Sequence, residues 1–128
     1  MKVLALDFGA ARTGVAVSDS TGTIARPVGV VERAASDSGL AALRELVREH
    51  EAERVVVGLP LTLRGERGEQ AHATEAFVEA LRGVVNVPVE MYDERFTTTI
   101  ASHVGGSAEE DARAAAHLLE TYLGSSAR

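Results

Sequence analysis

The first 32 residues contain three apolar segments that are separated only by short turns containing glycine. The segments span residues 2–8, 13–19 and 23–32, and Gly9 and Gly22 lie in the turns between them. Connections this short join antiparallel neighbours, so the pattern predicts a three-stranded meander. Pro27 has no amide hydrogen to donate to a neighbouring strand, which predicts that the third strand lies at an edge or is interrupted there.

After residue 32 the pattern changes to alternating helices and strands. A helix is predicted over residues 38–50, with Leu40, Leu43 and Val47 on one face, and a second over 69–82, with Ala73, Phe77 and Leu81 on one face. Further predicted elements are strands at 54–58 and 88–92, a short helix at 98–104 and a final helix at 108–123. The order predicts one α/β domain over residues 1–128, with a mixed sheet and helices on its faces.

The composition narrows the classes of function. The chain has no cysteine, which excludes a thiolate zinc site and a cysteine nucleophile and leaves oxygen or imidazole ligands for any metal ion. It has no apolar run of membrane-spanning length and no signal-peptide core, so we expect a cytoplasmic protein without a membrane partner. The net charge of −6 argues against a nucleic-acid binder. A metal-dependent nuclease is the exception, because its bound cations reverse the local charge.

Two acidic residues occupy matching places at the ends of predicted strands. Asp7 ends the first strand, and Glu94 lies just beyond the strand at 88–92. Functional groups in open α/β sheets gather where the carboxyl ends of the strands meet. Each residue also has a simpler interpretation: Asp7 as a turn-forming side chain before Gly9, and Glu94 as part of a solvated, ion-paired loop.

A third acid, Asp111, lies on the apolar face of the final helix. The segment from Ser107 to Glu110 has the pattern of a capping box, so Asp111 is not needed as the helix cap. Helical spacing aligns it with Ala115, Leu118 and Tyr122. An ionised carboxylate in such a place must be neutralised. Either a divalent cation shared with Asp7 and Glu94 does this, or the acid is protonated or paired with an arginine.

Three carboxylates around one or two magnesium ions would suit phosphodiester hydrolysis. Hard oxygen ligands match Mg²⁺, and Mn²⁺ is a suitable substitute. Two ions about 3.5–4 Å apart can activate a water molecule and stabilise the leaving oxygen.

Four strings also resemble a known family when they are taken together and in order. They are LALDFGAARTGVAVSD, VVVGLPLTLRGERGEQA, YDERFTT and DARAAAHLLETYL, and they resemble the YqgF/RuvX family over nearly the whole chain. The resemblance implies a ribonuclease H-like fold with a five-stranded mixed sheet, whose first three strands are antiparallel. It also implies a magnesium-dependent nuclease that matures the 5′ end of pre-16S ribosomal RNA, or a Holliday-junction resolvase related to RuvC.

The same resemblance implies that Asp7, Glu94 and Asp111 form the catalytic, metal-binding site. Candidate phosphate contacts are the loop arginines Arg12, Arg64, Arg67 and Arg95. In one respect the chain departs from the family. The segment between Arg95 and Asp111 contains no Lys or Arg, whereas family members are typically longer and basic there. This departure lowers the expected affinity for nucleic acid and does not affect the expected hydrolytic chemistry.

Two other functions remain open at this point. The opening Asp-Phe-Gly pattern also resembles the phosphate-binding start of actin-like kinases, although those proteins place nucleotide between two such domains. Alternatively, the chain is a ribosome- or polymerase-associated binding module that is not an enzyme. The set of three acids argues against a pure binding module. The sequence does not decide whether the substrate is RNA or DNA, nor does it give the oligomeric state.

Overall fold

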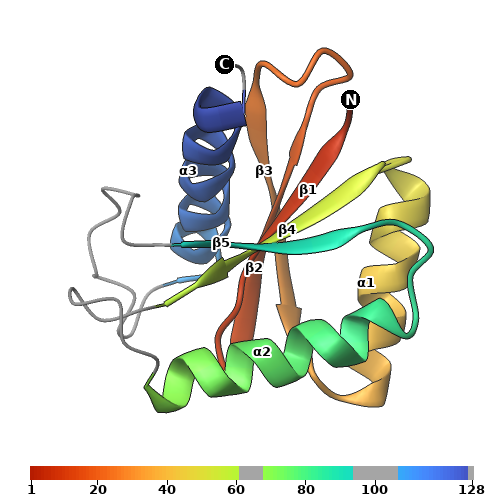
Figure 1. The fold of residues 1–128 in the computed structure, drawn as a ribbon, viewed down its shortest axis with the longest axis vertical. Coiled ribbons are helices and arrows are strands. Elements are labelled where there is room, and N and C mark those ends of the chain that lie inside the picture. Colours follow the sequence, from red (N-terminus) through yellow and green to blue (C-terminus); the bar gives the residue numbers. More distant parts are fainter. Residues whose placement is uncertain (61–67, 94–106, 127–128) are drawn as a thin grey trace.

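The protein folds around one mixed β-sheet with helices on both of its faces (Figure 1). The computed structural model describes residues 1–60, 68–93 and 107–126. The strands are β1 (Val3–Asp7), β2 (Arg12–Ser18), β3 (Ala25–Glu32), β4 (Arg54–Leu59) and β5 (Val89–Asp93), in the order β3-β2-β1-β4-β5. The helices are α1 (Asp37–Glu49), α2 (Glu69–Arg82) and α3 (Ala108–Ser126). The helix predicted at 98–104 falls outside the described residues.

The sheet combines an antiparallel half with a parallel half, as predicted. β1 pairs antiparallel with β2, and β2 pairs antiparallel with β3. β1, β4 and β5 are parallel neighbours, so their carboxyl ends lie at the same edge. β3 is an edge strand, and its pairing with β2 shifts register between Val15 and Ala16, opposite Pro27. The predicted edge position of Pro27 is therefore confirmed.

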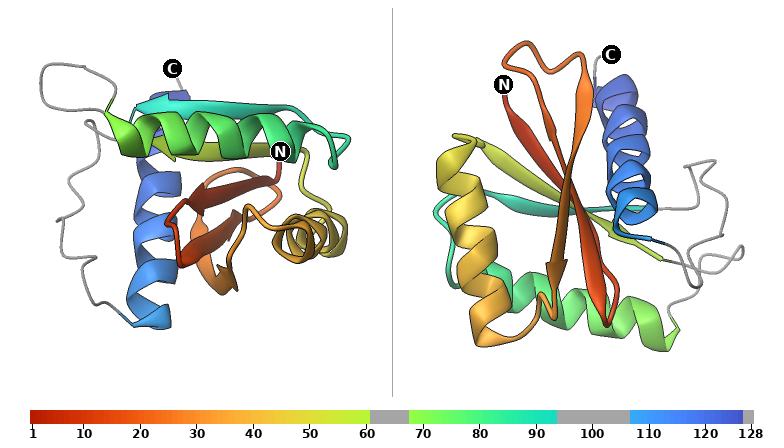
Figure 2. Two further views of the ribbon diagram at one scale, coloured as in Figure 1. Left: turned by 90° about the horizontal axis from the view of Figure 1, so that it is seen from below. Right: turned by 180° about the vertical axis from the view of Figure 1, so that it is seen from behind.

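The two faces of the sheet bury separate apolar clusters. Side chains alternate along β1, so that Leu4 and Leu6 pack with α1 and α2 while Val3 and Ala5 pack with α3. Figure 2 shows α1 and α3 on opposite sides of the sheet. Leu40, Leu43 and Val47 form the buried stripe of α1, as predicted. Among the described residues, no helix is both long enough and apolar enough to cross a bilayer.

The buried stripe of α2 differs from the prediction at one position. Ala73 is exposed, and Thr74 is fully buried beside Phe77 and Leu81. Residues three and four positions before Phe77 both lie near its face, so spacing alone does not decide between them. Thr74 tolerates burial because its hydroxyl donates to the Gln70 carbonyl at 2.8 Å.

A polar cluster ties the carboxyl-terminal half of α3 to the parallel strands. Arg54 Nη1 donates to the Tyr122 hydroxyl at 3.0 Å and to Glu90 Oε1 at 3.2 Å, and the Tyr122 hydroxyl donates to the same carboxylate. The Tyr122 hydroxyl and Glu90 together raise the pKa of Arg54 above its ordinary value. These contacts fix the position of α3 along β4 and β5.

Phe77 is the strongest test of the packing between α2 and the sheet. It is 2% exposed and stacks on Phe8, the residue after Asp7, with ring centroids 4.4 Å apart. Phe77→Ala should lower the free energy of unfolding by about 3–5 kcal/mol, measured by urea denaturation, because it leaves a cavity. Ala73→Gln is the matched control and should change it by less than about 0.5 kcal/mol. A large cost for Ala73→Gln would contradict the observed stripe.

Candidate functional site

Asp7 lies at the carboxyl end of β1, on the face of the sheet that α3 covers. It is half-buried and follows Val3 and Ala5 in strand alternation, and both of these pack against α3. In the antiparallel pairing its partner on β2 is Gly14. The turn to β2 is compact: the Gly9 amide donates to Thr13 Oγ1 at 3.4 Å. A Cβ on Gly9 would lie 2.5 Å from the Arg12 carbonyl oxygen.

The backbone of α3 comes into direct contact with β2 at Gly14. A Cβ on Gly14 would lie only 2.0 Å from the carbonyl oxygen of Asp111. Since Gly14 is also the pairing partner of Asp7, this approach brings Asp111 to the same part of the sheet as Asp7. Two of the three predicted acids, more than 100 positions apart in the chain, therefore both adjoin Gly14 through their backbones.

The capping box predicted before Asp111 is present. The Glu110 amide donates to Ser107 Oγ at 3.2 Å, and the Ser107 amide donates to Glu110 Oε1 at 2.9 Å. Asp111 therefore lies in the first turn of α3 with its carboxylate available for another role. Ala115, Leu118 and Tyr122 are buried on the same stripe, as predicted.

Arg12 neutralises Asp111 in this structure. Arg12 Nε lies 2.8 Å from Asp111 Oδ2, and the two side chains are 34% and 14% exposed. Arg12 begins β2 and shares the α3-facing side of the strand with Gly14 and Ala16, which explains how its side chain reaches the helix. The arginine-paired carboxylate is one of the alternatives that the sequence left open.

The remaining predicted site residues lie outside the described part of the chain. They are Glu94, Arg64, Arg67 and Arg95. Asp93 ends β5 at the same edge of the sheet as Asp7, but alternation places it with Met91, on the face that packs against α1 and α2. Within residues 1–60, 68–93 and 107–126, no three His, Asp or Glu side chains are grouped closely enough to hold a metal ion. The predicted set of three acids can be complete only through Glu94.

The structure adds Gly14 to the residues that sequence reasoning identified. A glycine inside a strand of buried apolar residues often marks a close backbone approach, and this was the available signal. The sequence also left the arginine partner of Asp111 unnamed, because the spacing of residues 12 and 111 carries no information about their contact.

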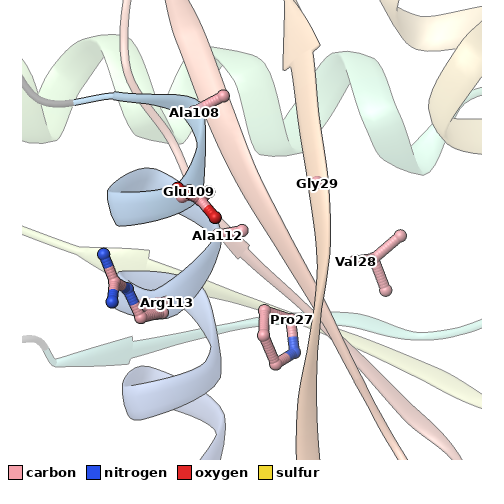
Figure 3. Close-up of a pocket in the computed structure, with 7 residues that line it drawn as sticks. All are labelled: Pro27, Val28, Gly29, Ala108, Glu109, Ala112 and Arg113. Carbon is pink, nitrogen blue, oxygen red and sulfur yellow. The ribbon is translucent and has the colours of Figure 1, made fainter.

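A hollow of about 380 Å³ lies between the start of α3 and the edge strand β3 (Figure 3). Pro27 and Val28 from β3 and Glu109, Ala112 and Arg113 from α3 contribute to its walls. Of the predicted site residues that the structure describes, which are Asp7, Arg12 and Asp111, none lines it. This hollow is therefore separate from the site defined by Asp7 and Asp111.

The fold is that of the RuvC nucleases, a ribonuclease H-like fold. A structure described as Thermus thermophilus RuvC in complex with Holliday junction substrate superposes with a TM-score of 0.62, covering 99% of this chain and 96% of that one. The two sequences are 19% identical. The predicted ribonuclease H-like architecture, with its first three strands antiparallel, is thereby confirmed.

This chain belongs to the RuvX family, whose model, described as Holliday junction resolvase, matches residues 1–125. Relatives named "Putative pre-16S rRNA nuclease" support the same assignment. The protein from Chloroflexus aggregans is 47% identical over 80% of this chain and 72% of its own length. That from Moorella thermoacetica is 39% identical over 96% of this chain and 94% of its own length. The family resemblance read from the four strings is confirmed.

Gly14→Ala tests the contact that brings the two acids together. The added methyl group would collide with the Asp111 carbonyl, so α3 must move away from β2. We expect a loss of about 1–3 kcal/mol in the free energy of unfolding, measured by chemical denaturation. Gly124→Ala is the control, because its Cβ would enter open space on the same helix. Equal stability of the Gly14→Ala variant and the wild type would show that the helix is not held this closely.

Proposed function

We propose that this chain is a cytoplasmic, magnesium-dependent nuclease that matures the 5′ end of pre-16S ribosomal RNA. The observation that carries the proposal is that Asp7 pairs with Gly14 within the sheet while the backbone of Asp111 packs against the same glycine from α3. Membership of the RuvX family and the names of its relatives support nucleic acid as the substrate class. The domain is taken to extend over residues 1–128.

The donor atoms fit a divalent metal ion. Asp7 and Asp111 supply hard carboxylate oxygens, the kind of ligand that Mg²⁺ and Mn²⁺ prefer. Glu94 follows β5 directly in the sequence and is proposed as the third ligand from the sequence alone. A bound divalent ion would supply an activated water molecule and stabilise negative charge on the phosphate.

The remaining proposed roles concern the orientation of the substrate. Arg12 contacts Asp111 and its side chain is 34% exposed, so its guanidinium is a candidate contact for the phosphate next to the scissile bond. Arg64, Arg67 and Arg95 are proposed as further phosphate contacts from the sequence alone. Their number matters because the net charge of −6 otherwise repels nucleic acid.

A Holliday-junction resolvase is the second candidate. The description of the family and the RuvC fold favour it. A resolvase must cut two strands symmetrically and therefore needs a dimer. Two measurements separate the two candidate functions. The first compares cleavage of a precursor-like RNA with cleavage of a four-way DNA junction, and the second determines the oligomeric state in the same buffer.

Asp7→Asn and Asp111→Asn should each reduce magnesium-dependent cleavage by roughly 10²–10³-fold. Metal-ion catalysis supplies several kcal/mol, and about 1.4 kcal/mol corresponds to a tenfold change in rate. Glu94→Gln should behave in the same way. The assay follows cleavage of a labelled precursor RNA and a labelled junction over a magnesium titration.

Glu109→Gln is the matched control for these variants. Glu109 is an exposed acid in the same turn of α3 as Asp111, so the substitution makes the same change in net charge outside the site. It should retain wild-type activity. If Asp7→Asn cleaves as fast as the wild type, the assignment of the active site is wrong. If the folded wild type cleaves neither substrate at any metal concentration, the binding-module function replaces the enzyme.

A further inference from the structure

We propose that Arg12 is an internal counter-ion for Asp111, and that a divalent cation binds at Asp111 in competition with it. Without metal, the guanidinium neutralises and holds the carboxylate. With metal, the guanidinium must leave the carboxylate oxygen that it contacts. This inference rests on the proposed metal site and assigns to Arg12 a role that precedes any contact with substrate.

The burial of Asp111 explains why it requires a counter-ion. Its side chain is 14% exposed and lies on a stripe with buried Ala115 and Leu118. An ionised carboxylate in such surroundings is costly unless a cation or several donors compensate for its lost hydration. The nearby amides of the helix terminus have partners of their own: the Glu110 amide donates to Ser107 Oγ, and the Asp111 amide to the Ser107 carbonyl. Arg12 supplies the full positive charge at 2.8 Å.

The two partners differ in how freely they can move. The backbone of Asp111 is fixed, because it lies in a capped helix that touches Gly14. Arg12 reaches Asp111 through a long side chain that is 34% exposed. An exchange of counter-ion therefore requires rotation of the arginine stem, while the acid stays beside Asp7. Arg12 in this sense is a positioning residue that preserves the site until metal arrives.

Competition has a thermodynamic consequence that can be measured without substrate. Two binding events that exclude each other weaken each other by the same factor. If the ion pair must break for the metal to bind, removing Arg12 should therefore increase the affinity of the site for the metal. The contact that the metal must displace is a charge-assisted hydrogen bond of 2.8 Å. Its strength predicts a change of about tenfold or more in the affinity for the metal.

The experiment is a Mn²⁺ titration of the full chain by isothermal calorimetry, in the absence of nucleic acid. Arg12→Gln, which keeps most of the side-chain length, should bind Mn²⁺ about tenfold or more tightly than the wild type. Arg113→Gln is the control, because it removes an exposed arginine from α3, the helix that carries Asp111, and changes the net charge by the same amount as Arg12→Gln. It should stay within about twofold of the wild type.

Thermal unfolding provides a second readout on the same variants. In EDTA, Arg12→Gln should have a lower Tm than the wild type, because Asp111 loses its counter-ion. In saturating Mn²⁺ the difference should shrink or reverse, because the metal then neutralises the acid. A Tm difference that is the same in EDTA and Mn²⁺ would indicate a purely structural ion pair and would overturn the inference.

Asp7→Asn separates failure of this inference from failure of the proposed function. If Asp7→Asn weakens Mn²⁺ binding but Arg12→Gln leaves it unchanged or weaker, the metal site stands and the competition is disproved. If Mn²⁺ binding is undetectable, or unaffected by Asp7→Asn, the proposed metal site is wrong and the inference falls with it.

Discussion

The contact between the backbone of α3 and Gly14 is the constraint on which the site depends. No other residue type fits there without displacing the helix, since a Cβ would lie 2.0 Å from the Asp111 carbonyl oxygen. Gly14 also pairs with Asp7, so one small residue adjoins two acids from opposite ends of the chain. The strand alternation that buries Val3 and Ala5 against α3 turns Asp7 toward the same helix. The contacts that pack α3 against β1 and β2 therefore also position the proposed metal ligands.

The electrostatics of the site follow from that packing. Asp7 and Asp111 both adjoin Gly14 in a protein of net charge −6, and the Asp111 side chain is only 14% exposed. Two apolar clusters, one on each face of the sheet, stabilise the elements that carry these acids. The Arg12–Asp111 ion pair compensates the charge of Asp111.

Within the residues that the structure describes, periodicity in the sequence predicted the helices and strands and most of their buried positions, since burial repeats every two residues in strands and every three or four in helices. It identified the stripe of Asp111, although it placed Ala73 where Thr74 is buried. It could not predict which residue of α3 lies over which residue of β2, because that depends on the closest approach of two backbones. For the same reason, the contact between Arg12 and Asp111 became visible only in the structure.

The ion pair between Arg12 and Asp111 also affects how this acidic chain would attract a nucleic acid. A guanidinium bound to Asp111 is already compensated and offers little attraction to a phosphate. If a divalent cation binds the carboxylates as proposed, the released guanidinium would add its charge to that of the metal. The proposed affinity for nucleic acid would then depend on metal occupancy through two additive terms, the ion itself and the arginine that it releases. An acidic protein could in this way bind a polyanion only when its active site is loaded.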